Sequence, residues 1–502
     1  MHRVIKFIFA IIAFFIVTYL IIFFPIPSLL VVGSVMLIVG IYDISQKKHT
    51  ILRNFPIIGH FRYLFEEISP EIHQYFVESD VDGKPLSRNQ RSYVYARAKL
   101  QNNTHPFGTE HDLQREKMEW TTHSIFPSKR LEDAPRVKIG GANCSKPYEA
   151  SLFNISAMSY GSLSKNAIMA LNKGAKAGGF YHNTGEGSVS NYHLMGGDIV
   201  YQVGTAYFGC RDKEGNFSEE KFKETALRDE VKMIELKLSQ GAKPGHGGIL
   251  PAQKNSKEIA RIRGVEPHTD VLSPPGHTAF SSYTEMMAFI GKLRELSDGK
   301  PIGFKICIGR KNEFESICDA IKETNIYPDF ITVDGAEGGT GAAPIIFSDH
   351  VGMPWENALV FVVDTLRRYN LRNEIKVITS GKIIDGFDIF KALCLGADIC
   401  NSARGMMLAL GCIQALECHK NTCPTGVATN NASRMRGLVV EDKWKRVKNY
   451  HGETIKDFLD LFMASGVSDL SQLNRSLIFQ QRDGKEVNFA DRYPEALEDS
   501  KI

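Results

Sequence analysis

The sequence predicts an α/β fold, a (β/α)8 TIM barrel that follows an N-terminal transmembrane helical hairpin. Three observations support the barrel: short apolar runs recur along the chain, each run is followed by a loop that contains glycine, and a helical pattern of apolar residues follows each loop. Eight runs have the length and composition of strands: 153–158, 180–185, 199–204, 233–238, 302–308, 329–335, 376–381 and 397–403.

The count of eight strands requires that the run "VLSPP" (271–275) be an excursion outside the barrel. A doubly wound parallel sheet is the alternative architecture. It would need a GxGxxG fingerprint after the first strand, whereas the chain has "SAMSYGSLS" there. In a barrel, functional groups lie at the C-terminal ends of the strands, and phosphate binds at the loops after strands seven and eight.

Composition and charge exclude several classes of protein. The 502 residues are 43% hydrophobic and 23% charged, which is ordinary for a folded chain with a large core. Lys and Arg number 60 against 57 Asp and Glu, so the charge balance indicates no nucleic-acid partner. Nine mostly scattered cysteines do not form the dense, even set of a secreted disulfide domain, and they favour a reducing compartment.

The first 45 residues are predicted to form the transmembrane hairpin. The apolar run Val4–Phe24 is long enough to span a bilayer, and after "PIP" the shorter run 28–42 could return through it. Basic residues precede the first run and recur in 46–53, so the positive-inside rule places the catalytic domain in the cytoplasm, at the inner or plasma membrane. The alternatives are a signal peptide, for which no cleavage site follows, and one span with an interfacial segment.

The rest of the chain divides into three predicted regions. Residues 46–130 mix polar stretches with short helical patterns and contain no repeat, as expected for an N-terminal extension packed on the barrel. Residues 131–435 form the barrel and include a cysteine-rich loop near its end. Residues 436–502 form a C-terminal helical extension.

Glycines and basic residues follow the last strands, where a barrel binds phosphate. Gly381 and Lys382 follow the seventh run, and Ala403 and Arg404 follow the eighth. Exposed backbone N–H groups beside a helix N-terminus bind a phosphate monoester, although plain turn chemistry explains the glycines equally well. Lys305 lies in the fifth run, where it can face the interior and meet either a flavin's N1–C2=O edge or a barrel carboxylate.

Three other loops carry candidate ligand contacts. The loop "DGAEGGTGAAP", which contains Gly338 and Gly339, allows the backbone to approach a flat ligand closely. "NTGEGS" places Glu186 between two glycines, and "KLSQGAKPGHGG" places Lys237 and Lys243 beside a flexible loop. Two lysines near one carboxylate suit a dianionic substrate. The alternative is that these are ordinary charged residues of solvent-exposed loops.

Three cysteines, Cys412, Cys418 and Cys423, are separated by five and then four residues in "CIQALECHKNTCP". Three soft thiolates in one loop can converge on one centre. Zinc with His419 as a fourth ligand is one interpretation. An iron–sulfur cluster is the other, and the Cys423–Pro424 pair is shared with many such sites. Packing alone explains this spacing less well.

Several of these motifs together resemble the FMN-binding synthase domain of glutamate synthase, over roughly residues 130–475. The motifs are "SAMSYGSLSKNA", "NTGEGS", "LSQGAKPG", "DGAEGGTGAAP", "GMPWE" and "ALGCIQALECHKNTCPTGVAT". The resemblance implies a barrel that binds FMN and reduces 2-iminoglutarate, formed from 2-oxoglutarate and ammonia, to L-glutamate. It also implies a [3Fe–4S] cluster on Cys412, Cys418 and Cys423, through which electrons reach the flavin.

The resemblance further implies roles for single residues. The expected flavin contacts are Ser159, Gly161 and Ser162 along the ring, Lys305 at the pyrimidine edge, and Gly381, Lys382, Ala403 and Arg404 at the phosphate. Glu186, Lys237, Lys243 and Arg263 match the family's substrate and active-site segments. The lysines and Arg263 would neutralise carboxylates, and Glu186 or a lysine would transfer protons.

The chain also departs from the family's pattern. The usual "KPGEGGQLPG" is "KPGHGGILPA" here, so His246 and Ile249 replace polar groups expected at the substrate, and the pocket is expected to differ. His2 follows Met1, so no N-terminal cysteine nucleophile is expected, and ammonia, an amine or a separate amidotransferase must supply nitrogen. Without a nicotinamide-binding fingerprint, the reductant is expected from a ferredoxin, an NAD(P)H-dependent flavoprotein or a membrane carrier.

These observations together predict a membrane-anchored oxidoreductase with FMN and a [3Fe–4S] cluster, acting as a glutamate synthase. Two alternatives remain open. One is a flavin dehydrogenase that oxidises an amino or hydroxy acid and passes electrons to the membrane. The other is a non-catalytic redox subunit, which the retention of Glu186, Lys237, Lys243 and Arg263 disfavours.

Overall fold

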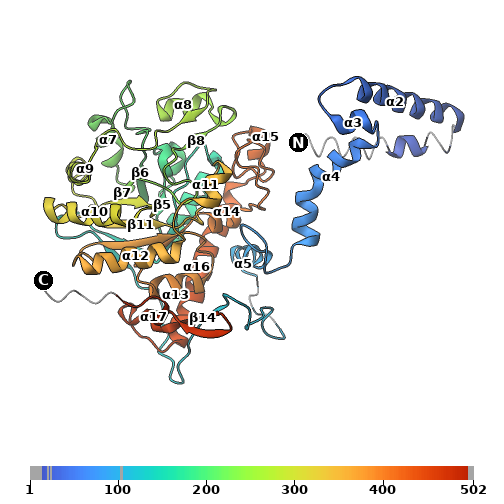
Figure 1. Ribbon diagram of the computed structural model, residues 1–502. Helices are drawn as coiled ribbons and strands as arrows, with labels where there is room; N and C mark the ends of the chain where they lie inside the picture. The colour runs from blue at the N-terminus through green and yellow to red at the C-terminus, as the bar shows by residue number, and fades with distance from the viewer. Residues whose placement is uncertain (1–13, 20–21, 23–24, 102–103, 105, 496–502) are drawn as a thin grey trace. The chain divides into compact units, whose positions relative to one another are not determined.

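The chain forms two compact units in the computed structural model, which describes residues 14–19, 22, 25–101, 104 and 106–495 (Figure 1). The N-terminal unit is Met1–Asn89 and the C-terminal unit is Gln90–Ile502. Each unit is described by itself.

The C-terminal unit is built on a closed barrel of eight parallel strands, in the order β10-β11-β12-β13-β4-β5-β6-β7. Their bounds are β4 (Phe153–Ile155), β5 (His182–Asn183), β6 (Ile199–Val203), β7 (Val231–Lys237), β10 (Ile302–Ile306), β11 (Phe330–Asp334), β12 (Lys376–Ser380) and β13 (Ile399–Ser402). Each strand coincides with one of the eight predicted runs. The barrel prediction is therefore confirmed.

The predicted excursion at 271–275 also lies outside the barrel. β9 (Val271–Leu272) pairs with β8 (Ile249–Leu250) in a separate antiparallel ribbon. The barrel can exclude this segment because β10 pairs directly with β7. The long β7–β10 connection is therefore free to fold beside the C-terminal ends of the strands.

Helices surround the barrel. Their bounds are α6 (Lys165–Gly178), α7 (Glu219–Ala226), α8 (Lys257–Arg263), α9 (Tyr283–Leu296), α10 (Lys311–Thr324), α11 (Ile345–His350), α12 (Trp355–Arg368), α13 (Gly386–Cys394), α14 (Arg404–Leu410), α15 (Ala432–Met435), α16 (Val440–Ala464) and α17 (Phe489–Arg492). Local sequence explains their ends. Ser164 caps α6 by accepting a hydrogen bond from Ala167 N, and Gly179 ends it in the left-handed region. The long α16 packs against α6, α13 and α14.

The barrel interior contains a buried polar network rather than apolar side chains alone. Glu235, on β7, accepts hydrogen bonds from Asn183 on β5 at 2.8 Å, Gln202 on β6 at 2.6 Å and Thr332 on β11 at 2.6 Å. A buried carboxylate is tolerated when such donors surround it. The network therefore joins strands on opposite sides of the carboxylate.

Two further small sheets complete the unit. β2 (Val137–Ile139) and β3 (Tyr148–Ala150) form a hairpin, and β1 (Glu119–Thr121) joins β14 (Ile478–Arg482) and β15 (Lys485–Asn488) in a three-stranded sheet. The segment 436–502, expected to be helical, thus includes a β-hairpin. Asp483 and Gly484 both have positive φ, at 49° and 71°, which is the two-residue turn that an Asp-Gly pair favours.

The N-terminal unit is helical. It contains α2 (Pro25–Ser45), α3 (Thr50–Asn54), α4 (Gly59–Ile72) and a π-helical turn (His73–Val77), and α5 (Arg88–Ala98) begins at its end. Asp43, near the end of α2, is fully buried and accepts hydrogen bonds from Ile57 N at 2.8 Å and from His60 Nε2 at 3.0 Å. This carboxylate fixes the turn between α2 and α4.

The predicted transmembrane hairpin is wrong as far as the structure describes it. Most of the first predicted span, Val4–Phe24, lies outside the described residues. Among those that are described, no helix has the combined length and apolar character needed to cross a membrane. A spanning helix needs about 20 apolar residues, whereas the apolar run of α2 ends before the buried Asp43. The predicted plasma-membrane location with a cytoplasm-facing domain depended on this hairpin and is contradicted by the same finding.

Candidate active site at the C-terminal end of the barrel

A buried ion pair lies where β5 and β7 end. Glu186 sits in a short 3-10 turn (Gly185–Gly187), and its Oε2 is 2.8 Å from Nζ of Lys237, the last residue of β7. Gly185 has a φ of 63°, and a Cβ there would lie 2.8 Å from Ser159 N. Only glycine allows the turn to approach the loop after β4 this closely, so the glycines of "NTGEGS" position the carboxylate.

Two more cations surround Glu186. Arg263, at the end of α8, is only 3% exposed and donates hydrogen bonds to Ser159 Oγ at 3.3 Å and Tyr160 O at 3.1 Å. Lys243 is 2% exposed, and its Nζ donates to Ala342 O. Burial alone would raise the pKa of Glu186, but Lys237, Arg263 and Lys243 outweigh it and hold that pKa below its usual value.

The four residues form one electrostatic cluster, named here the Glu186 cluster: Glu186, Lys237, Lys243 and Arg263. Three cations face one carboxylate, so the cluster has positive charge in excess and suits a ligand with two carboxylates. Burial lowers the pKa of Lys243 to about 8, while Glu186 raises it and Lys237 lowers it further. Lys243 can therefore exchange a proton near neutral pH.

His277 joins this site and was not predicted from the sequence. Its Nε2 is 2.9 Å from Lys237 O and must carry the proton, so Nδ1, 3.1 Å from the Tyr207 hydroxyl, accepts from it. Burial lowers the pKa of His277 to about 4, which keeps the ring neutral. The signal available was a histidine after glycine in "SPPGHTAF", just beyond the run 271–275 that was assigned as an excursion.

His246 and Ile249 flank the Glu186 cluster without bonding to it. The His246 ring is half-buried, with Nδ1 2.9 Å from Gly247 O and the ring edge against Phe347 at 5.2 Å. Ile249 lies in β8, opposite Leu272. Between them, Gly248 approaches Glu186 so closely that a Cβ would lie 2.1 Å from Oε1.

The expected phosphate-binding residues lie on neighbouring loops. β12 pairs with β13, and Ser402 Oγ donates to Ile383 O at 2.6 Å, so the loops after these strands meet. Gly381 and Lys382 have φ values of 137° and 59°. α14 begins after Ala403, which provides no side-chain cap. The turn after β12 and the first turn of α14 thus present backbone N–H groups at one corner of the barrel.

Arg404 lies against the glycine-rich loop. Its guanidinium donates to Glu337 O, and a Cβ on Gly339 would be 3.2 Å from Arg404 Cδ. A Cβ on Gly338 would be 3.1 Å from Asp334 Oδ1. On the facing loop, Ser162 Oγ would be 2.8 Å from a Cβ on Gly341.

Lys305 points into the barrel but has a protein partner. Its Nζ is 3.1 Å from Asp334 Oδ2, and both side chains are less than 10% exposed. Burial would lower the pKa of Lys305, whereas Asp334 and Glu235 raise it above its usual value. Of the two partners that the sequence left open, the structure shows the barrel carboxylate.

The three cysteines of the predicted metal site are thiols within electrostatic reach of one another. Burial raises the pKa of Cys412 to about 12, Gln414 N lowers it, and Cys418 and Cys423 raise it further. His419 is exposed. Within the described ranges, no three His, Cys, Asp or Glu side chains are arranged to hold a metal ion. The geometry thus brings the thiols near each other but does not itself form a ligand set.

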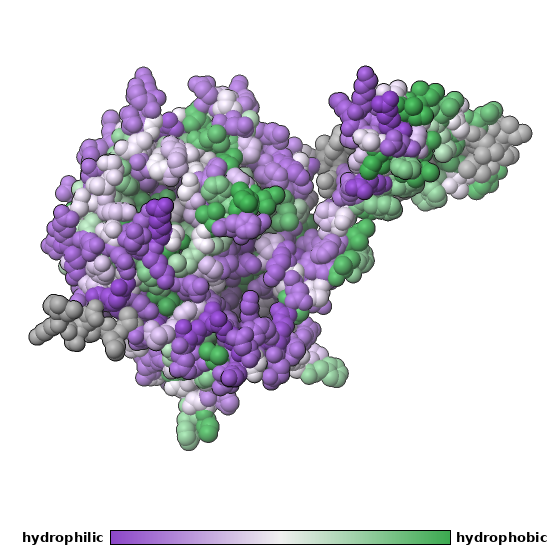
Figure 2. Space-filling model, in the orientation of Figure 1, coloured by the Kyte–Doolittle hydropathy of each residue, from purple (hydrophilic) through white to green (hydrophobic). Residues whose placement is uncertain are grey.

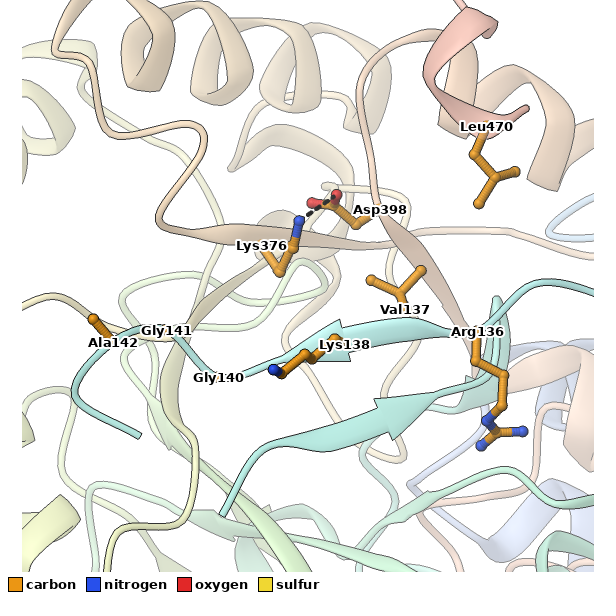
Figure 3. A pocket seen from close by; sticks show the side chains of 9 residues that line it. All are labelled: Arg136, Val137, Lys138, Gly140, Gly141, Ala142, Lys376, Asp398 and Leu470. Atoms are coloured by element: carbon orange, nitrogen blue, oxygen red, sulfur yellow. Dashed lines mark ion pairs between the residues drawn. The ribbon is translucent and has the colours of Figure 1, made fainter. Parts of the chain in front are cut away.

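A pocket lies at the opposite end of the barrel (Figure 3). Lys376 begins β12, Asp398 precedes β13, and their Nζ and Oδ1 atoms are 3.8 Å apart. The lining residues are Arg136, Val137, Lys138, Gly140, Gly141, Ala142, Lys376, Asp398 and Leu470. Because it opens at the N-terminal ends of the strands, this pocket is separate from the Glu186 cluster.

Known proteins resemble the chain over most of its length. A family profile described as the conserved region in glutamate synthase matches residues 95–468. The glutamate synthase large subunit-like protein YerD of Bacillus subtilis (strain 168) is 39% identical over 89% of this chain and 93% of its own length. The archaeal glutamate synthase [NADPH] of Methanocaldococcus jannaschii is 35% identical over 64% of this chain and 60% of its own.

Other matches are partial or remote. The glutamate synthase [NADPH] large chain of Bacillus subtilis (strain 168) is 32% identical over 56% of this chain but only 18% of its own length. Among solved structures, a flavocytochrome b2 variant with sulfite bound matches at 14% identity and a TM-score of 0.43, over 83% of this chain and 85% of that chain. The family profile and the relative that matches nearly end to end show that the chain belongs to the glutamate synthase family of oxidoreductases.

Proposed function

We propose that this protein is an FMN- and iron–sulfur-dependent oxidoreductase that converts 2-oxoglutarate and ammonia, by way of 2-iminoglutarate, to L-glutamate. The observation that carries the proposal is the Glu186 cluster, in which Lys237, Lys243 and Arg263 surround one buried carboxylate. A dicarboxylate is the ligand that this excess of positive charge suits. Relatives named glutamate synthase support the same substrate.

The roles of the cluster residues follow from their burial and charge. Arg263 is held by Ser159 and Tyr160, so its guanidinium is oriented in advance for a substrate carboxylate. Lys243, with a pKa of about 8, can bind a second carboxylate and give up a proton within the working pH range. Glu186 stays ionised and holds Lys237 in place.

The C-terminal end of the barrel fits FMN. The uncapped start of α14 and the turn at Gly381 and Lys382 would hold the phosphate, together with Ala403 and Arg404. Ser159, Gly161 and Ser162 on one side, and Gly338 and Gly339 on the other, would line the ring, because glycine leaves room for a flat ligand. Lys305, already paired with Asp334, would stand near the pyrimidine edge. Bound FMN supplies the hydride for the imine carbon.

The cysteine loop fits an iron–sulfur cluster by its donors. Cys412, Cys418 and Cys423 are free thiols on one loop, close enough that Cys423 raises the pKa of the other two and Cys418 raises that of Cys412. Soft thiolates select such clusters, and a [3Fe–4S] cluster there would pass electrons to the flavin. A separate donor, a ferredoxin or an NAD(P)H-dependent flavoprotein, supplies them. The names of an archaeal and an archaeal-type glutamate synthase among the relatives include NADPH, which supports the second donor.

The test is a single-turnover reaction. Anaerobically purified protein, reduced with dithionite, is mixed with 2-oxoglutarate and ammonium while flavin absorbance and glutamate are followed. Flavin reoxidation with one glutamate per flavin is expected, and omission of either substrate should abolish it. If flavin and iron are both bound but neither reoxidation nor glutamate is seen, the proposed substrate is wrong.

One observation favours a second candidate, a dehydrogenase that oxidises a different amino or hydroxy acid. His246 and Phe347 form an aromatic contact beside the cluster, and Ile249 adds an apolar side chain where the family usually has polar groups. These groups favour a substrate with a less polar side chain. Reduction of bound FMN by such acids, without added reductant and with 2-oxoglutarate inert, would identify this activity.

A further inference from the structure

Lys254 is a buried cation that the proposed chemistry does not use. It ends a short 3-10 turn (Ala252–Lys254) after β8 and is 2% exposed. Its ammonium group donates three hydrogen bonds, to the carbonyl oxygens of Ser162 at 2.5 Å, Cys418 at 3.2 Å and Ala428 at 3.3 Å. All three of its N–H donors are therefore occupied.

These three carbonyls belong to the two loops that would hold the cofactors. Ser162 lies in the loop after β4 (159–164), and Cys418 and Ala428 lie in the cysteine loop (412–431). Asn430 reinforces the same junction, because its Nδ2 donates to both Gly161 O and Lys254 O at 3.0 Å. The predicted flavin loop and the cysteine loop are thus bonded to one ammonium group.

The charge of Lys254 has no carboxylate to balance it. Within the described part of the chain, no Asp or Glu oxygen lies within ion-pair distance of its Nζ, in contrast to the buried Lys305 with Asp334 and Lys237 with Glu186. The thiols of Cys418 and Cys423 lie within electrostatic reach of it and, once deprotonated as cluster ligands, would attract it. A buried cation without a carboxylate is costly unless another negative group lies beside it.

The geometry points to Lys254 as a positioning residue that joins the cysteine loop to the flavin loop and favours the reduced form of the iron–sulfur cluster. This inference rests on the proposed function, since it requires that Cys412, Cys418 and Cys423 hold the cluster. One-electron reduction breaks no bond and adds one negative charge to a centre that thiolates already make anionic. A fixed cation beside that centre stabilises the added charge, as hydrogen bonds and charge tune such potentials.

The test compares four variants of the full-length protein, purified without oxygen. Lys254→Met removes the charge and the donors, whereas Lys254→Gln removes the charge and keeps an N–H donor. Lys254→Arg keeps the charge. Asn430→Ala is the matched control, since it removes an uncharged bond between the same two loops. Iron and sulfide contents are measured first, and then the cluster is titrated with dithionite and mediators while its EPR signal is recorded.

We expect both neutral variants to lower the equilibrium constant for reduction of the cluster at least tenfold. For a one-electron couple, a tenfold change lowers the midpoint potential by about 59 mV. Lys254→Arg and Asn430→Ala should stay near the wild-type potential. If only the two neutral variants lose their iron while Lys254→Arg keeps it, the requirement for charge is also supported. Equal potentials in the wild type and the neutral variants, or loss of iron from Lys254→Arg as well, would overturn the inference.

Failure of the proposed cluster would look different. In that case the wild-type protein itself would hold neither iron nor sulfide, whatever residue stands at position 254. Both the cluster and the role of Lys254 would then be rejected, while bound FMN and the Glu186 cluster could still be tested.

Discussion

Glu186 is the residue on which the proposed substrate site depends, because it is the one carboxylate among three buried cations. Glu186→Gln keeps the shape of the side chain but leaves the charge of Lys237 unpaired, and it removes a group that can hold a proton. We expect glutamate formation to fall on the order of 100-fold or more. FMN content should not change, since the expected phosphate corner lies on other loops.

The control for this prediction is Glu219→Gln. Glu219 forms an exposed ion pair with Lys292 at 2.6 Å, and exposed pairs contribute little to stability. Its activity should equal that of the wild type. Full activity of Glu186→Gln would show that the cluster is structural only.

Lys243 gives the site a dependence on pH. Burial lowers its pKa to about 8, so the ammonium form that attracts a carboxylate predominates below that pH and is lost above it. We expect the Kd for 2-oxoglutarate, measured by calorimetry, to rise up to tenfold per pH unit above about pH 8. Lys243→Arg should abolish this rise, because a guanidinium stays charged. A Kd that is flat in the wild type between about pH 7 and about pH 9 would contradict the assignment.

At the level of single residues, the sequence motifs identified the charged site residues, several of which lie beside glycines. Glu186, Lys237, Lys243 and Arg263 were predicted, and the structure brings all four together. His277 was missed because its role depends on Lys237 O and the Tyr207 hydroxyl, which only the folded β7–β10 connection brings near it. The pairing of Lys305 with Asp334 could not be decided either, since an inward lysine fits both partners.

At the level of elements, the approach of Gly248 to Glu186 constrains the loop after β7. A Cβ at position 248 would lie 2.1 Å from Glu186 Oε1, so Gly248→Ala must displace the carboxylate from Lys237. We expect at least a tenfold loss of glutamate formation with a small change in Tm, because the displaced group is a side-chain end. Gly276→Ala is the control, since nothing lies within 4 Å of its Cβ position. Equal activities of the two variants would refute this constraint.

The elements differ in how far their sequence determines them. The eight barrel strands are almost entirely buried runs between turn residues, so each was visible from the sequence, even β5 with only His182–Asn183 in regular pairing. The β14–β15 hairpin was missed although its Asp-Gly turn is a strong signal. The second predicted membrane run, 28–42, fails for another reason, because an apolar run does not show that a charged residue such as Asp43 will be buried beside it.

Figure 2 shows that hydrophobic residues also remain at the surface of the C-terminal unit, where Figure 1 draws α11. Ile345 and Ile346 are 79% and 62% exposed there. Their short helix carries Phe347, which contacts His246. The unit therefore has an apolar surface on the same short helix that contacts His246.

The whole molecule should lose stability in acid, because several histidines are buried in the neutral form. Burial lowers the pKa of His182 well below its usual value, and it lowers those of His193 and His451 to about 3. The unfolded chain binds these protons below about pH 6.5 and the folded chain does not, so their contribution is present above that pH and is lost as the pH falls. Each lost proton corresponds to about 1.4 kcal/mol per pH unit.

Two neighbouring carboxylates, Asp385 and Asp388, act in the opposite direction, because burial raises the pKa of both. Burial and the neighbouring Asp385 raise the pKa of Asp388 to about 8, so its protonated form stabilises the folded chain as the pH falls below that value. Burial also lowers the pKa of His277 to about 4, so four histidines stand against these two aspartates and leave an excess of about two protons bound by the unfolded chain. We therefore expect the free energy of unfolding, from urea titrations, to fall by about 3 kcal/mol between pH 6 and pH 5.

A single substitution can assign part of this slope. His451 stacks on Phe180 at 3.9 Å, so His451→Phe keeps the packing and removes one titrating group, although it leaves Ser151 Oγ without its 3.0 Å contact to Nε2. Its absolute stability should fall slightly, but its slope below pH 6.5 should decrease by about one proton. The exposed His111, changed to Asn, should leave the slope unchanged. If His451→Phe keeps the wild-type slope, this histidine is protonated in the folded chain and the acid sensitivity must come from other groups.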